Sequence, residues 1–432
     1  MVVVMNDSRL RSAGLTYGRV IFLASVLAFI AEPAAAQVGT LAQPLSPPDP
    51  NAALHYQRGL LYLQAIDKDQ RQLLEKPIWE SLVAIERRRM DGELRRLLYQ
   101  GRLALRSAST GARLEVCDFG IDFRSHGPAT PLPHVASMVE LGRLMTLRAA
   151  YEMSRGNWEE SGVILFDGLR IGRHLAHQPT VAEAIAGMEI LTNNYWALAH
   201  WGCACPEPAM VARAQRLFET IAGDLIDPTK SVTGEMSILR RRLDGLRAAY
   251  PVGPWAELIL EELGEEIPAG SPEEIRATAK KLCVARGVDE SVFENAGSFV
   301  AHVTRVHDVQ LRFSEAVAAC MTLPPIARAK KAERIYENYS RLAGAIGETL
   351  VLDPVELGSL FAVHQAELAL LRVTLAIGAK RNRETGEFPK SLESLDGVFG
   401  GDVPVSPYDG GQLQFETLRD GKGVYLAVRS VG

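Results

Sequence analysis

The stretch from residue 117 to residue 134 holds the densest group of side chains that could do chemistry. Its thiol, imidazole and carboxylate groups are ligands that transition metals accept, and a cysteine beside a histidine can form a nucleophile pair. The stretch also contains Phe119 and Phe123, so we favour a loop that packs these rings onto neighbouring helices. A metal-binding protein or an enzyme that uses this loop is the alternative. The candidate metal ligands are Cys117, Asp118, His126 and His134, with Asp122 between them.

Two further groups of histidines fall on predicted helices. His174 and His177 are one turn apart, on the same helix as Asp167 and Arg170, and could share a ligand. We favour a polar helix face for these residues. The other group would require two helices to meet in the core, and we interpret its members as ordinary core or surface side chains: His302, His307, Asp308, His364 and Glu367.

An aromatic cluster is the candidate binding surface. It consists of Tyr195, Trp196 and Trp201. Aromatic rings can line a groove for a peptide or a glycan, and they also dominate the packing of helix cores. We favour helix packing and keep the groove as the alternative.

The sequence lacks the motifs that usually mark an active site. The HExxH, GxSxG, P-loop and GxGxxG patterns are absent, and no glutamate stands three residues before a histidine as in a di-iron bundle. We therefore predict no catalytic residue and no cofactor.

Composition narrows the class of protein. The chain has 432 residues, of which 47% are hydrophobic and 23% are charged, and these fractions are typical of a folded globular protein. The net charge of -5 argues against a nucleic-acid partner, which would attract a basic surface. The mean hydropathy of +0.01 excludes a polytopic membrane protein.

The N-terminal segment resembles a secretory signal peptide. Arg9, Arg11 and Arg19 precede an apolar run over residues 20–30, and alanines at 34–36 form a cleavage site before Gln37. We expect residues 1–36 to direct export, so that the protein is periplasmic, envelope-associated or secreted and has no membrane span after cleavage. An uncleaved anchor is the alternative. Residues 37–50 contain four prolines and form a predicted extended lead-in.

The cysteine count bears on this location. An odd number of cysteines outside the cytosol leaves at least one thiol unpaired or bonded to another chain. Cys203 and Cys205 are too close for an easy mutual disulfide, although either could pair with a distant cysteine. The others are Cys117, Cys283 and Cys320, and the sequence does not determine the pairing.

Helical spacing of apolar residues dominates from Asn51 to Gly378. We predict a mainly α protein, with a multi-helix body over 51–352 and a tail over 353–432. The tail consists of a long helix and a small α+β part with a β-hairpin. Glycines at 162, 168 and 172 indicate close helix–helix approach. The predicted helices cover 52–67, 77–107, 135–154, 158–175, 180–202, 207–224, 231–249, 253–265, 271–285, 289–320, 324–346 and 353–381.

Two short patterns resemble known families. Ala149-Ala-Tyr151 followed by Gly156-Asn-Trp158 is similar to one tetratricopeptide hairpin, although no repeat array follows. The tail resembles the head of type II secretion pseudopilins, through Gly386-Glu-Phe-Pro389, Leu392, Leu395 and the Pro404–Gly411 turn. This resemblance implies a small α+β unit built on the long helix.

The whole chain is similar to a group of exported, mostly helical proteins of planctomycete bacteria. The shared pieces are Asn51–His55, Cys117–Gly120, Leu132–His134 and Gly156–Trp158. The resemblance implies export and a helical architecture, and it implies no reaction. We therefore expect a scaffold or binding protein of the cell envelope, whose partner is an envelope protein or a peptide.

Overall fold

The computed structural model describes residues 50–74, 92–123, 130–250, 252–262, 265–348 and 354–381, with short stretches between 385 and 429. The predicted signal peptide, the lead-in up to residue 49, the first part of the helix predicted over 77–107 and His126 lie outside the described residues. The prediction of a mainly helical protein is confirmed.

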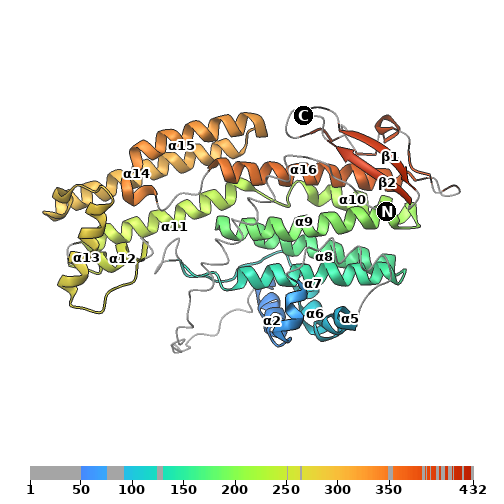
Figure 1. The fold of residues 1–432 in the computed structure, drawn as a ribbon, viewed down its shortest axis with the longest axis horizontal. Coiled ribbons are helices and arrows are strands. Elements are labelled where there is room, and N and C mark those ends of the chain that lie inside the picture. The colour runs from blue at the N-terminus through green and yellow to red at the C-terminus, as the bar shows by residue number, and fades with distance from the viewer. Residues whose placement is uncertain are drawn as a thin grey trace.

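The N-terminal part of the described chain forms a group of short helices on one side of the molecule (Figure 1). They are α2 (Ala52–Gln64), α3 (Lys68–Arg71), η1 (Gln72–Leu74), α5 (Gly92–Gln100) and α6 (Arg102–Ala112). Asn51 caps the first helix, because its side chain accepts a hydrogen bond from the N–H of Ala53. The helix predicted to run to residue 107 is instead divided at Gly101. A Cβ atom there would lie 2.8 Å from Cδ2 of Leu144, so α5 and α6 approach α7 closely.

Three long helices form the centre of the molecule, α7 (His134–Ser154), α8 (Trp158–Ala176) and α9 (Val181–Ala204). Gly156, in the turn between the first two, has a φ of 80°, which favours glycine. The predicted close approach at Gly168 is confirmed, since a Cβ atom there would lie 2.7 Å from Cγ of Asn194 on α9.

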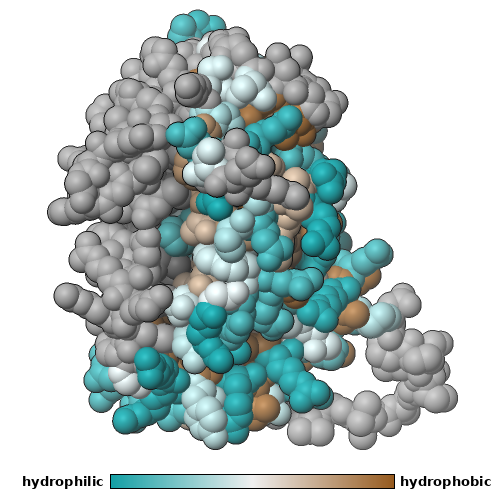
Figure 2. Space-filling view, turned by 90° about the vertical axis from the view of Figure 1, so that its right-hand side faces the viewer, coloured by the Kyte–Doolittle hydropathy of each residue, from teal (hydrophilic) through white to brown (hydrophobic). Residues whose placement is uncertain are grey.

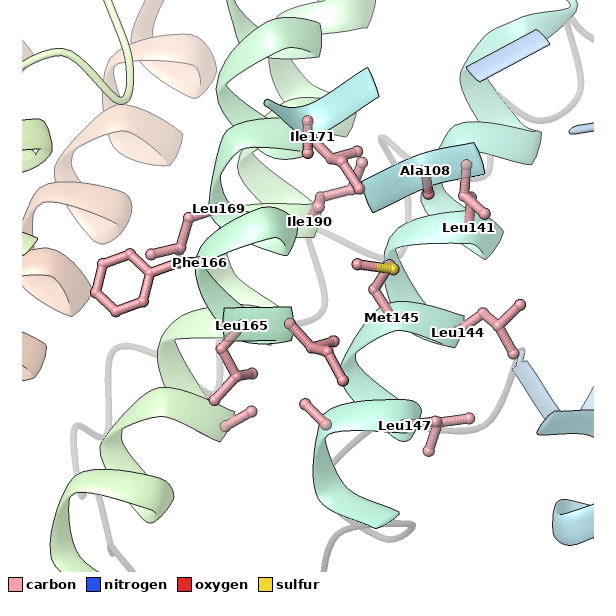
Figure 3. Packing of buried hydrophobic residues seen from close by; sticks show 14 of the residues in the cluster. Ala108, Leu141, Leu144, Met145, Leu147, Leu165, Phe166, Leu169, Ile171 and Ile190 are labelled. Atoms are coloured by element: carbon pink, nitrogen blue, oxygen red, sulfur yellow. The ribbon is translucent and has the colours of Figure 1, made fainter. Parts of the chain in front are cut away.

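The main hydrophobic core fills the space between these three helices (Figure 3). Leu144 and Met145 of α7 and Leu165 of α8 are fully buried within it. Figure 3 shows Phe166 on the side of α8 that is turned away from α7. The two sides of α8 therefore have different neighbours.

The helices α10 (Pro208–Ala222) and α16 (Pro354–Ala379) pack against each other, and α16 also packs on α9. Leu371 and Leu375 of α16 belong to the main core, so the predicted boundary at residue 352 does not separate two packing units. Among the described residues, α16 is the one helix long and apolar enough to cross a membrane, and 72% of its most apolar window is buried.

A second group of helices extends away from this centre (Figure 1). They are α11 (Pro228–Ala249), α12 (Trp255–Glu262), α13 (Pro272–Ala285), η3 (Glu290–Phe293), α14 (Ala296–Met321) and α15 (Pro325–Glu348). The single helix predicted over 289–320 is divided, because the side chain of Asn295 accepts the N–H of Ser298 and begins a new helix. Aromatic stacking of Tyr250 on Phe299 joins α11 to α14.

The last described part of the chain lies on α16. It contains η4 (Leu392–Leu395), β1 (Gln414–Asp420) and β2 (Gly423–Arg429). The two strands pair antiparallel, with Phe415 opposite Val428. Leu395, Phe399 and Leu413 form a small core with Ile377 of α16.

Figure 2 views the molecule from the right-hand side of Figure 1, where hydrophilic residues predominate on the described surface.

Candidate functional site

The polar groups around Cys117 hold a loop against the helices. The carbonyl of Cys117 accepts a hydrogen bond from Nε2 of Gln178, and the carboxylate of Asp118 accepts the N–H of Gly120. Asn51 bonds both the N–H and the carbonyl of Asp118. Gly120 has a φ of 67°, the left-handed conformation that this turn requires.

His134 is buried at the start of α7 with a protein partner. Its Nε2 lies 2.9 Å from Oε1 of Glu183, and its ring stacks on Phe119 with centroids 4.0 Å apart. Phe119 joins the main core, in agreement with the packing interpretation that we favour, while Phe123 is half-buried. The ring of His134 therefore connects the loop to the capping box of α9.

The thiol of Cys117 is poorly suited to nucleophilic chemistry. Burial raises its pKa to about 12, and the charges of Asp118 and Glu183 act in the same direction. Because the thiolate is the nucleophilic form, a thiol that keeps its proton is a poor nucleophile.

Three or more metal-binding side chains do not converge anywhere in the part of the chain that the structure describes. Asp122 is exposed, and His126 lies outside the described residues. The four-ligand metal site therefore stays a prediction.

Replacing His134 separates a structural role from a metal site. We expect His134→Ala to lower the free energy of unfolding by about 2 kcal/mol, because Glu183 loses a buried hydrogen bond and Phe119 a stacked neighbour. Cys117→Ala is expected to change the free energy of unfolding by less than about 1 kcal/mol. Residue 117 bonds Gln178 through its backbone carbonyl and not through its thiol. Urea denaturation measures both values. Stoichiometric zinc or copper in the purified chain, lost in both variants, would contradict the structural role.

His174 in α8 and His177 at its C-terminal cap contact different protein groups. Nδ1 of His174 lies 2.6 Å from the hydroxyl of Tyr56, and both groups are buried. Burial lowers the pKa of His174 to about 4, and Arg173 acts in the same direction, so the imidazole is neutral at pH 7. Nε2 of His177 lies 4.0 Å from Oδ1 of Asp224 at the surface.

The later histidines belong to different packing environments. His307 on α14 lies beside Asp308, with 3.6 Å between Nδ1 and Oδ1. On α16, Nε2 of His364 lies 3.1 Å from the hydroxyl of Tyr195, and Glu367 accepts a 2.6 Å hydrogen bond from Thr192. Both of these α16 contacts are to α9, and they make a buried polar network between two core helices.

A groove of about 840 Å³ runs between α8 and α10. The two helices have little direct contact with each other, and the end of α6, with residues 113–115, closes one side. Val163 and Leu217 are each 43% exposed on opposite walls, so two large apolar side chains line one space. The main apolar lining residues are Val163, Phe166, Trp201, Met210, Leu217 and Ile221.

Charged side chains of both signs stand along this groove. Asp167 is almost fully buried and pairs with Arg170 at 3.1 Å and with Arg113 at 3.4 Å. Arg173 pairs with Asp224 across the groove. Glu159 and Arg213 also line it, and neither has an ion-pair partner among the described residues.

The aromatic cluster divides between the core and the groove. Tyr195 is buried against His364, and Trp196 is half-buried and hydrogen-bonded to Glu367. Trp201 donates its ring N–H to the carbonyl of Trp158, and its ring lies beneath Gly162 at the floor of the groove. Of the three candidate residues, Trp201 lines the groove.

All five cysteines are free. Four of them are buried, and Cys117 is partly exposed. Burial raises the pKa of Cys203 to about 12 and that of Cys283 to about 11. The fold therefore holds together without a disulfide.

No family model, curated protein or solved structure matches the chain. The groove between α8 and α10 is the feature that sequence reasoning missed. A signal was present on residues 158–175, where Val163, Phe166, Arg170 and Arg173 recur on one helix face. The opposite wall comes from a helix about 50 residues later, which no pattern in the sequence connects to the first.

Proposed function

We propose that this chain is an exported helical scaffold or binding protein of the cell envelope, without catalytic activity, that holds a partner in the α8–α10 groove. The observation that carries this proposal is the exposure of Val163 and Leu217 on facing walls of a single groove. Concave apolar sites with a few charged groups are the usual binding sites of proteins.

Sequence features support the location and the architecture. Residues 1–36 resemble a signal peptide, and the tail on α16 resembles the pseudopilin head. The hairpin of α7 and α8 is similar to a tetratricopeptide unit, a type of helical pair that commonly presents grooves to other proteins. The similarity to exported planctomycete proteins agrees with these features.

If residues 1–36 are a signal peptide, the mature chain has a defined N-terminus. We expect the chain recovered from cells to begin at Gln37, because Ala34 and Ala36 form an A-x-A site and signal peptidase cleaves after its last residue. N-terminal sequencing of protein from the envelope and from the medium measures this. A chain that retains residues 20–30 in the membrane fraction would contradict cleavage and support the anchor.

Substitutions in the groove test the binding function. Peptides of about 16 residues are first selected from a displayed library for binding to the mature chain. We expect these peptides to bind the Val163→Asp and Leu217→Asp variants at least about tenfold more weakly than the wild type. Each substitution would bury an unpaired carboxylate under the bound peptide. Leu61→Asp is the matched control, since Leu61 is 67% exposed on α2 and does not line the groove. Peptides that bind all three variants equally would contradict the groove as the binding site.

A further inference from the structure

The shape of the groove restricts what it can hold, and this inference rests on the proposed function. Lining residues recur along α8 from Glu159 to His174, and along α10 from Met210 to Ile221. Fifteen residue steps at 1.5 Å each make the longer wall about 22 Å long. The groove is therefore as long as about four turns of helix.

The two helical walls, α8 and α10, offer no backbone partner to an extended peptide. Both are α-helices, whose N–H and C=O groups are bonded within the helix. An extended segment on the apolar floor would leave its own backbone groups unpaired there, which is costly. A helix satisfies its backbone internally and presents only side chains.

The distribution of side chains in the groove is amphipathic. The floor is mainly apolar, with Phe166 and Trp201 at its base, and the buried side chains of Asp167 and His174 also line it. The rims carry charges of both signs, and Glu159 and Arg213 have no ion-pair partner among the described residues. This pattern complements a helix with one apolar stripe flanked by both acidic and basic side chains.

We propose that the groove binds an amphipathic α-helix of about four turns that a partner protein presents. The apolar stripe of this helix contacts Val163, Phe166, Met210 and Leu217. Its flanking acidic and basic side chains pair with Arg213 and Glu159.

A proline scan of the selected peptides tests this proposal. Every peptide whose binding depends on Val163 and Leu217 is synthesised with proline, or with alanine as a control, at one central position outside its apolar stripe. We expect the selected peptides to carry apolar residues at i, i+3, i+4 and i+7 and to become more helical on binding. We expect the proline substitution, but not the alanine substitution, to reduce affinity by about tenfold or more.

The outcomes separate this inference from the proposed function. Groove-dependent peptides that lack the helical pattern and tolerate the proline would overturn the helical occupant and leave the groove as a binding site. Failure to select any peptide that depends on Val163 and Leu217 would overturn both. Arg213→Glu should weaken peptides with an acidic flank and strengthen those with a basic one at that end.

Discussion

Gly187→Ala is expected to lower the free energy of unfolding by about 3 kcal/mol. A Cβ atom on Gly187 would lie 2.7 Å from both Cα and Cβ of Ala176 on α8. Backbone atoms cannot move aside as the end of a flexible side chain can, so α8 and α9 would have to separate. The loss is expected although alanine is the better helix former by about 1 kcal/mol. Chemical denaturation of the purified chain measures it.

Gly245→Ala is the matched control for this prediction. Gly245 lies within α11, and nothing comes within 4 Å of a Cβ atom built on it. Alanine there removes backbone entropy without a clash, so this variant is expected to gain up to about 1 kcal/mol. The same substitution therefore has opposite signs at the two sites. Equal effects would show that helix propensity, and not contact between α8 and α9, governs the result at Gly187.

Glu367→Gln is expected to stabilise the protein above pH 7 and to have little effect near pH 4. Burial raises the pKa of Glu367 from 4.5 to about 7, against hydrogen bonds from Thr192 and Trp196 that favour the charged form. Between these pH values the folded state binds more protons than the unfolded state, so rising pH removes stability. This shift in pKa corresponds to a loss of about 3 kcal/mol in the free energy of unfolding as the pH rises. Glutamine has no proton to lose, so the variant would not show this loss.

The comparison of variant with wild type is necessary because His364 acts in the opposite direction. Burial lowers the pKa of His364 to about 3, so the folded state binds fewer protons than the unfolded state between that value and 6.5. The contribution of His364 to stability therefore increases with pH, whereas that of Glu367 decreases. Measurements on the wild type alone would show only the sum of the two. Subtracting unfolding free energies at each pH isolates the carboxyl group. Glu315→Gln on the exposed side of α14 is the control. A difference that does not change with pH would contradict the raised pKa.

Local signals in the sequence predicted most of the helices. Apolar spacing predicted separate helices over 135–154 and 158–175, and the turn between them is where Gly156 adopts a positive φ. The errors arose where one residue outweighs the apolar pattern. Gly101 divides a predicted helix because α7 lies against it, and Asn295 divides another because its side chain caps a new start.

The candidate site was less accessible to sequence reasoning because its walls are far apart along the chain. The glycine at 168 predicted a close approach, but its neighbour Asn194 is not identified by any pattern. Asp167 was interpreted as part of a polar face, whereas the structure buries it between Arg113 and Arg170. Tertiary contacts of this kind depend on which helices become neighbours, and helical spacing alone does not encode this.

The five free thiols have a consequence for when the chain is vulnerable to oxidation. Thiol–disulfide exchange needs a thiolate that can reach its target, and in the folded protein burial suppresses both requirements at Cys203 and Cys283. An unfolded chain would expose all of its cysteines at their ordinary pKa. Under the proposed export, the period of risk is therefore the interval between translocation and folding. Once the helical core has formed, burial of the thiols gives the protection from exchange.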